Sequence, residues 1–276
     1  MGKNMKNKLK LFIIYFVYIL AFVGLIFLLL PLSFKQHIIN IFAPRKDAPQ
    51  EIAEEISQNY NGRYIILTFD DGWSSQYKAY KRLKPFTFKG TLYICSSLIG
   101  GEDRLTLDNL KEMYNSGWDI CNHTVHHVNL AKVSTKKAYD EIYGCSAWIS
   151  GHGFTKNEGY KHFAYPEGGY NDSVIKILKE QGFLTARTTN AGSDTTKLLE
   201  LGRASLYGMT KKNIRDYILS DKKLIIFCMH RIVPDDSKKI AEIDLKESYF
   251  DEVISSIVES KRQVVTITEW YKLNNR

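Results

Sequence analysis

The sequence predicts an α/β protein built as a single barrel-like β/α domain, and three observations predict it. From Arg63 onwards, short apolar runs rich in β-branched and aromatic residues alternate with longer stretches of helical periodicity. Seven such runs over about 210 residues suit one barrel better than two separate domains. Polar residues with catalytic chemistry directly follow several runs, as expected at the carboxyl ends of barrel strands.

The predicted strands are the apolar runs, and the predicted helices lie between them. We expect strands over Tyr64–Phe69, Gly90–Cys95, Asp119–Asn122, Lys161–Ala164, Leu184–Arg187, Leu224–Met229 and Gln263–Thr266. We expect helices over Ser75–Leu83, Thr106–Ser116, Thr135–Ser150, Asp172–Gln181, Thr210–Leu219 and Glu247–Ser260. This alternation is typical of a parallel sheet.

The chain begins with a basic segment and a long apolar run. Residues 11–30 carry no charge, and a helix of twenty residues spans about 30 Å, the thickness of the hydrocarbon core. We therefore expect a basic cytoplasmic segment at 1–10 and an uncleaved transmembrane helix at 11–32. A cleavable signal peptide is the alternative, but its apolar region is usually only about 7–15 residues long.

Lysines precede this run and few follow it, which predicts a single-pass cell-membrane protein with an extracytoplasmic catalytic domain. The polar segment at 33–61, which contains Pro44 and Pro49, is predicted to be a stalk, and residues 62–276 the catalytic domain. Four cysteines, none with CxxC spacing, would then lie where disulfides persist. Disulfides and buried free thiols both remain open at this point.

A net charge of +8 is compatible with nucleic acid binding, but the distribution of the charged residues along the chain argues against it. Residues 1–35 contain five lysines and no acidic residue. Without those lysines, 33 basic residues face 30 acidic ones. Much of the basic excess therefore belongs to the N-terminus, and we expect the lipid bilayer, not a nucleic acid, to be its partner.

Two adjacent carboxylates, Asp70 and Asp71, follow the first predicted strand and precede Gly72. Adjacent acids can divide their roles, since one can bind a cation while the other accepts a proton. A solvated turn is the alternative interpretation of this pair alone.

Three histidines cluster after the third predicted strand, and two of them, His123 and His127, stand four residues apart. On a helical turn both imidazoles would face the same way, as in zinc motifs of other folds. Together with Asp71 they form a His, His, Asp set that leaves coordination positions open for water and substrate. A pair of surface histidines is the alternative. Cys121 lies inside the predicted strand and is expected to pack in the core.

Two further strand ends carry candidate residues. The loop Tyr165–Gly169 contains Pro166 and Gly168, so its backbone can approach a ligand closely. His230 follows the strand at Leu224–Met229 and is a candidate acid or base, because the pKa of an imidazole lies near neutrality. A turn without function and a structural histidine are the respective alternatives.

In this order the motifs resemble those of the NodB-type polysaccharide deacetylases, carbohydrate esterase family 4. The resemblance runs from about Tyr64 to Trp270 and rests on Thr68-Phe69-Asp70-Asp71-Gly72, His123-Thr124-Val125-His126-His127, Tyr165-Pro166-Glu167-Gly168 and the strand that closes at His230. The segments FAYPEGGYN and GWDICNHT are most similar to the deacetylases of exported poly-N-acetylglucosamine.

The resemblance implies a distorted (β/α)7 barrel, a divalent metal that is usually Zn2+, and removal of N- or O-acetyl groups from sugars. It implies metal binding by Asp71, His123 and His127, a general base in Asp70 and a general acid in His230. It also implies that the backbone N–H of Glu167 stabilises the oxyanion, and that Tyr165, Pro166, Gly168 and Arg203 lie around the substrate.

The sequence departs from the family pattern in three respects. Many members carry an arginine two residues before the motif proline to hold the base, but that position is Ala164 here, so we expect Arg203 to supply the charge. Glu167 replaces the usual aromatic residue, and no Asp-x-x-x-Trp motif is present to tune His230.

The sequence therefore predicts a membrane-anchored, metal-dependent deacetylase of N-acetylglucosamine-containing polysaccharide, with partners in an exopolysaccharide or cell-wall system. The same site acting on peptidoglycan, chitooligosaccharide or an O-acetylated glycan is one alternative. A catalytically weak sugar-binding scaffold is another, although binding alone does not require a metal set together with an acid and a base.

Overall fold

The computed structural model describes residues 62–275 apart from 193 and 239. The predicted cytoplasmic segment, transmembrane helix and stalk lie outside these residues. In the part of the chain that is described, no helix is both long enough and apolar enough to cross a membrane.

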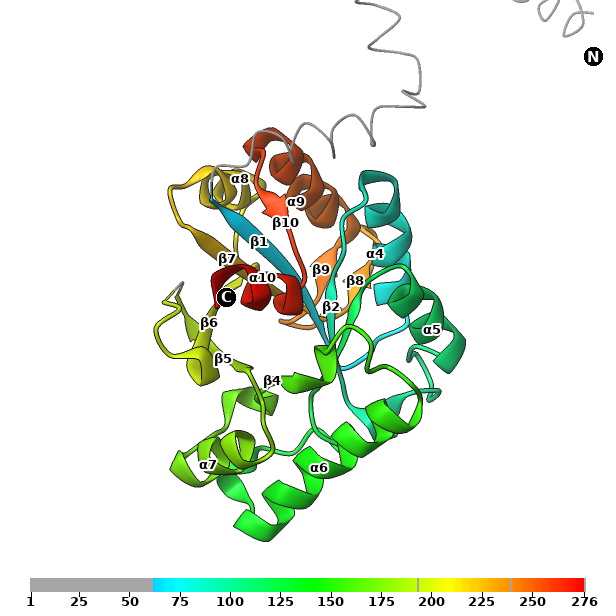
Figure 1. The fold of residues 1–276 in the computed structure, drawn as a ribbon. Coiled ribbons are helices and arrows are strands. Elements are labelled where there is room, and N and C mark those ends of the chain that lie inside the picture. The colour runs from blue at the N-terminus through cyan, green and yellow to red at the C-terminus, as the bar shows by residue number, and fades with distance from the viewer. Residues whose placement is uncertain (1–61, 193, 239, 276) are drawn as a thin grey trace, which may run out of the picture. The chain divides into compact units, whose positions relative to one another are not determined.

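Seven parallel strands form a closed ring, so the predicted α/β barrel is confirmed (Figure 1). They are β1 (Tyr64–Asp70), β2 (Thr91–Ile94), β3 (Asp119–Asn122), β4 (His162–Ala164), β5 (Thr185–Ala191), β6 (Leu201–Ser205) and β7 (Leu224–Met229). Each strand pairs with the next, and β7 pairs with β1 along Tyr64–Phe69 to close the ring.

The barrel is distorted at two of its seams. On the side of β1 away from β7, Tyr64 and Ile65 pair with the short strand β10 (Gln263–Val264), whereas Thr68 to Asp70 pair with β2. The strand predicted at Gln263–Thr266 is therefore a short strand that pairs with the amino end of β1 and is not one of the seven strands of the ring. The ring instead includes β6, which was not predicted. Strands β3 and β4 meet through a single register pair.

Helices follow the strands along the chain, as the sequence pattern predicts (Figure 1). They are α4 (Ser75–Leu83), α5 (Leu107–Asn115), α6 (Thr135–Gly151), α7 (Asp172–Glu180), α8 (Lys211–Leu219), α9 (Glu247–Ser260) and α10 (Ile267–Asn274). Five begin at a polar residue whose side chain accepts a hydrogen bond from the N–H three positions on, namely Thr106, Ser134, Asn171, Thr210 and Thr266. These caps fix where the helices start after each loop.

Successive side chains along each strand point alternately to the outside and to the inside of the barrel, and this determines which of them face its interior. On β1, Ile65, Leu67 and Phe69 pack in the cluster that contains residues of helices α4, α5 and α9. The intervening Tyr64 and Ile66 belong to a separate cluster with Trp270 of α10. Because strand side chains alternate between faces, Asp70 continues this second series onto the inner face.

Cysteine packing follows the same rule. Cys121 is buried in the inner cluster, as predicted, and Cys228 follows Leu224 and Ile226 on the inner series of β7. All four cysteines are buried free thiols, which resolves the choice left open by the sequence.

Candidate metal and catalytic site

The three predicted metal ligands converge on one carboxylate oxygen. Nε2 of His123 lies 3.5 Å and Nε2 of His127 lies 3.3 Å from Oδ1 of Asp71. This oxygen is buried and has no hydrogen-bond partner among the described residues. A buried acceptor without a donor is costly unless something else satisfies it. Two imidazoles and a carboxylate are a common zinc donor set, so these residues fit a divalent cation.

A tight loop, not the predicted helical turn, brings the two imidazoles together. Thr124 and His127 have positive φ values of 72° and 56°. The N–H of Thr124 donates to Oδ1 of Asn122 at 2.8 Å, and the N–H of His127 donates to the Thr124 hydroxyl at 3.0 Å. The two imidazoles do face the same way, as predicted, but the cause is this loop, which side-chain hydrogen bonds stabilise.

A hydrogen bond at Nδ1, the ring nitrogen that does not face Asp71, fixes the orientation of His123. Its Nδ1 lies 2.8 Å from the carbonyl oxygen of Ala164. Because a carbonyl only accepts hydrogen bonds, Nδ1 carries the proton and the lone pair of Nε2 faces Asp71. Burial lowers the pKa of His123 to about 4, against the opposing effect of the neighbouring carboxylates. The ring is therefore neutral at pH 7, as metal binding requires.

Two residues that the sequence analysis missed hold Asp71. The indole Nε1 of Trp73 donates to Oδ2 of Asp71 at 3.2 Å, and Arg104 donates to the Asp71 backbone carbonyl at 3.1 Å. The Arg104 guanidinium also stacks 3.4 Å above the Trp73 ring. Trp73 thus engages one carboxylate oxygen and leaves Oδ1 toward the histidines.

Asp70 is buried beside this set and forms an ion pair with Arg187 of β5. Burial would raise the pKa of Asp70, but the charges of Arg187, His123 and His230 hold it well below its usual range. Asp70 is thereby kept ionised, as a general base must be. The prediction that Arg203 supplies this charge is wrong, because the inner face of the barrel places Arg187 there.

His230, which directly follows β7, faces the same carboxylate. Its Nε2 lies 3.8 Å from Oδ2 of Asp70. The amide of Gln76, also missed by the sequence analysis, donates to the backbone carbonyls of Asp70 at 2.5 Å and His230 at 3.1 Å. Gln76 therefore ties the ends of β1 and β7 together and holds the predicted base and acid at a fixed separation.

The loop after β4 starts next to His123, since Ala164 supplies the carbonyl that orients that ring. Glu167 has a φ of 54° and is exposed. A Cβ on Gly168, at φ 70°, would lie 2.1 Å from the Thr189 hydroxyl, so the loop requires glycine there. Tyr165 is buried, and its hydroxyl donates to the Leu199 carbonyl at 2.9 Å. Pro166 is likewise buried, so these two residues support the loop.

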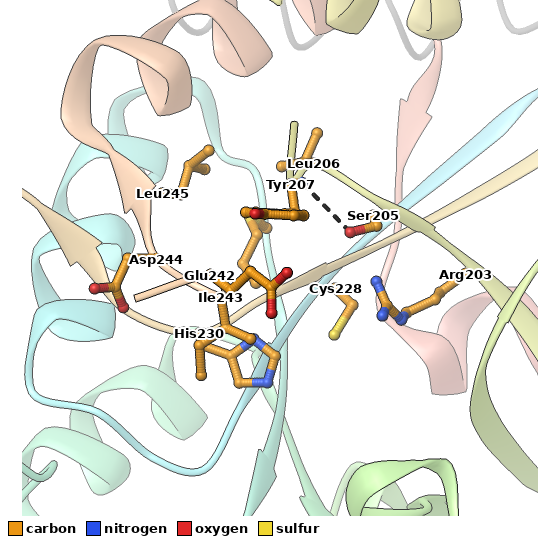
Figure 2. Close-up of a pocket in the computed structure, with 11 residues that line it drawn as sticks. Arg203, Ser205, Leu206, Tyr207, Cys228, His230, Glu242, Ile243, Asp244 and Leu245 are labelled. Atoms are coloured by element: carbon orange, nitrogen blue, oxygen red, sulfur yellow. Dashed lines mark hydrogen bonds between the residues drawn. The ribbon is translucent and has the colours of Figure 1, made fainter. Parts of the chain in front are cut away.

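A pocket of about 270 Å³ borders His230 and Cys228 (Figure 2). Arg203 lines it, and its buried Nε has no hydrogen-bond partner in the described part of the chain. Figure 2 shows Arg203 and Glu242 directed into the pocket from opposite sides. The structure thus places Arg203 at this pocket, near the site but away from the base.

Comparisons with known proteins match this chain to deacetylases. The model of the polysaccharide deacetylase family matches residues 57–186, which include both acidic residues, both histidines and the loop after β4. The "putative polysaccharide deacetylase YxkH" of Bacillus subtilis is 28% identical over 158 residues, 52% of this chain and 52% of its own length. A peptidoglycan-N-acetylglucosamine deacetylase of Bacillus cereus is 25% identical over 190 residues, 65% of this chain and 84% of its own length.

Among solved structures, the Streptococcus pyogenes deacetylase PplD in complex with acetate is 31% identical in sequence. That match covers 56% of this chain and 70% of PplD, with a TM-score of 0.48. The chain spans about half the length of the first three curated relatives that it matches.

Proposed function

Because this chain belongs to the polysaccharide deacetylase family, the NodB-type carbohydrate esterases, we propose that it hydrolyses N-acetyl groups of an N-acetylglucosamine-containing polysaccharide. The products are acetate and a free amine on the sugar. The observation that carries the proposal is the convergence of His123 and His127 on Oδ1 of Asp71, which has no hydrogen-bond partner among the described residues, with the ionised Asp70 next to it.

An amide is a poor electrophile, so the reaction needs both a polarised carbonyl and a strong nucleophile at neutral pH. A divalent metal held by Asp71, His123 and His127 supplies both, by Lewis acidity and by lowering the pKa of water. Zn2+ suits this donor set.

The remaining steps belong to the side chains and backbone of the protein. Asp70, kept ionised by Arg187, accepts a proton from the attacking water. The backbone N–H of Glu167 donates to the carbonyl oxygen as negative charge develops there, a contact typically worth about 3 kcal/mol. His230 gives a proton to the departing nitrogen, so that the sugar leaves as an amine.

The substrate and the location are part of the same proposal. The B. cereus relative is named a peptidoglycan-N-acetylglucosamine deacetylase, which supports the N-acetylglucosamine unit. The segments around Ala164 and Asn122 resemble those of poly-N-acetylglucosamine deacetylases, which supports the polymer. The apolar run at 11–30 anchors the chain in the cell membrane with its catalytic domain outside. Free amines become cationic and change how a polymer adheres to a negatively charged envelope.

Acetate release tests the proposal directly. The full-length chain in detergent is stripped of metal, reloaded with Zn2+ and given N-acetylglucosamine oligomers, peptidoglycan, chitooligosaccharides or O-acetylated glycans. We expect the highest rate on N-acetylglucosamine oligomers. A higher rate on peptidoglycan would change the polymer and keep the site, whereas no acetate from any glycan would contradict the proposed function.

A further inference from the structure

A second set of metal-binding side chains lies beside the predicted metal ligands. Asp70, Cys228 and His230 each offer one ligand atom, and these atoms lie within 4.8 Å of one another. Asp70 and Cys228 come from the carboxyl ends of the neighbouring strands β1 and β7, and His230 directly follows β7. None of the three belongs to the Asp71, His123 and His127 set.

The separations between these donors suit a tetrahedral ion. Sγ of Cys228 lies 3.3 Å and Nε2 of His230 lies 3.8 Å from Oδ2 of Asp70. Zinc bonds of about 2.0–2.3 Å in tetrahedral geometry place neighbouring ligand atoms roughly 3.3–3.8 Å apart. The three side chains can therefore bind one ion with little movement of the backbone.

A buried oxygen and an open approach support the same site. Oδ2 of Asp70, the oxygen from which the two separations are measured, also contacts Arg187. The other oxygen of the same carboxylate, Oδ1, is buried and, within the described residues, has no hydrogen-bond partner. Such an oxygen retains lone pairs that a cation can use. Cys228 and His230 line the pocket of about 270 Å³, and the His230 side chain is 19% exposed (Figure 2). An ion can thus reach the set through this pocket.

We propose that Asp70, Cys228 and His230 form a second, inhibitory site for thiophilic divalent cations such as Zn2+ and Cd2+. A thiolate, an imidazole and a carboxylate are the ligands that these ions favour. Binding releases the Cys228 thiol proton to solvent and leaves the thiolate on the ion. The positive charge of Arg187 weakens this site, so it fills after the first one.

The inhibitory effect rests on the proposed function, whereas the binding does not. An ion on these ligands occupies the carboxylate that accepts a proton and the imidazole that donates one. The chain is therefore expected to be active with one equivalent of metal and inhibited by a second.

Cadmium titration of the full-length, metal-stripped chain tests the binding. Cd2+ bound to a thiolate absorbs in the ultraviolet, and we expect two equivalents to bind, with a thiolate band growing over the second. Cys228→Ser should lose that band and weaken the second equivalent by about tenfold or more, since even outer-shell changes cost about 10–100-fold in affinity. Cys95→Ser is the matched control, because Cys95 is a buried thiol beside Asp71 and His123. This variant can change the absorbance of the first equivalent, but it should keep the thiolate band that grows over the second.

Two further measurements separate the possible failures. Circular dichroism checks that Cys228→Ser is folded, and His230→Gln, at a partly exposed position, should also weaken the second Cd2+. The proposal is overturned if only one equivalent of Cd2+ binds, or if the thiolate band over the second equivalent survives in Cys228→Ser. Inhibition is scored as acetate release relative to each variant's own rate with one equivalent of Zn2+. If two equivalents of Cd2+ bind and the thiolate band responds to the substitutions as expected but no glycan releases acetate, the second metal site stands and the proposed function fails.

Discussion

The guanidinium of Arg187 contacts the carboxylate of Asp70, although 117 positions separate the two residues in the sequence. Both side chains are buried, one at the end of β1 and the other on β5, so they meet across the inner face of the barrel. A buried carboxylate remains ionised only when a partner compensates its charge. Closure of the barrel therefore determines the charge state of the predicted base.

Arg187→Met should destabilise the protein strongly, because it leaves Asp70 as an uncompensated buried charge. Breaking such a pair typically costs about 3–5 kcal/mol, to be measured as the free energy of unfolding in urea. Adding Asp70→Asn to Arg187→Met should restore part of this loss. Arg203→Met is the control, and its cost should be about 1 kcal/mol or less. Equal losses in the two arginine variants would show that Arg187 has no special role.

Asp70→Asn should separate metal binding from catalysis. Asp70 lies outside the predicted metal set, so the variant should keep one equivalent of Zn2+ while acetate release falls by about 10²–10⁴-fold. His123→Ala should lose both the metal and the activity, because it removes a ligand whose ring is already oriented by Ala164. Metal content by atomic emission and acetate release on the same samples provide the check. Full activity in Asp70→Asn would sink the assignment of the base.

Strand-end motifs were predictable, whereas partners across the barrel were not. Asp70, Asp71, His123 and His230 could be placed because each follows an apolar run directly. Arg187 is the last residue of the predicted strand Leu184–Arg187, and nothing local shows that its side chain faces Asp70. Arg203, the arginine that the family resemblance favours, lies in another strand and lines a pocket instead.

Two elements were missed for different physical reasons. Strand β6 reads LGRAS, which has too few apolar and β-branched residues to stand out and depends on its neighbours in the ring. Helix α10 does have a sequence signal, because Thr266 and Glu269 form a capping box at its start. The strand predicted over Gln263–Thr266 includes Thr266 and so conceals this signal. The contact of Trp73 with Asp71 depends on the positive φ of Asp71, which only the folded loop reveals.

Gly168→Ala should disturb the loop that presents the Glu167 N–H. The added Cβ would meet the Thr189 hydroxyl at 2.1 Å, in a backbone conformation that already disfavours side chains. We expect acetate release to fall by about tenfold or more, in line with the loss of part of an oxyanion contact. Gly182→Ala is the control, because Gly182 has a similar φ of 76° but no atom of the described residues lies within 4 Å of an added Cβ. Comparable activity losses in both variants would refute the role of the loop.

His162 should make the protein less stable in acid. Burial lowers its pKa to about 3, from an ordinary 6.5, and its Nε2 has no hydrogen-bond partner within the described chain. Between these two pH values the unfolded chain binds a proton here and the folded protein does not, so stability falls as pH falls from about 6.5 to about 3. The full effect corresponds to about 5 kcal/mol. His162→Gln should flatten this part of the curve in urea unfolding at a series of pH values, and an unchanged slope would contradict the assignment.

We propose that a metal bound by His123, His127 and Asp71 makes this chain a deacetylase. The most direct measurement is acetate release from N-acetylglucosamine oligomers by the full-length chain, before and after one equivalent of Zn2+ is returned to the metal-stripped protein. We predict that stripping abolishes release and that one equivalent restores it in the native chain but not in His123→Ala. Release that continues at the same rate without metal, or that returns fully in His123→Ala, would contradict the claim.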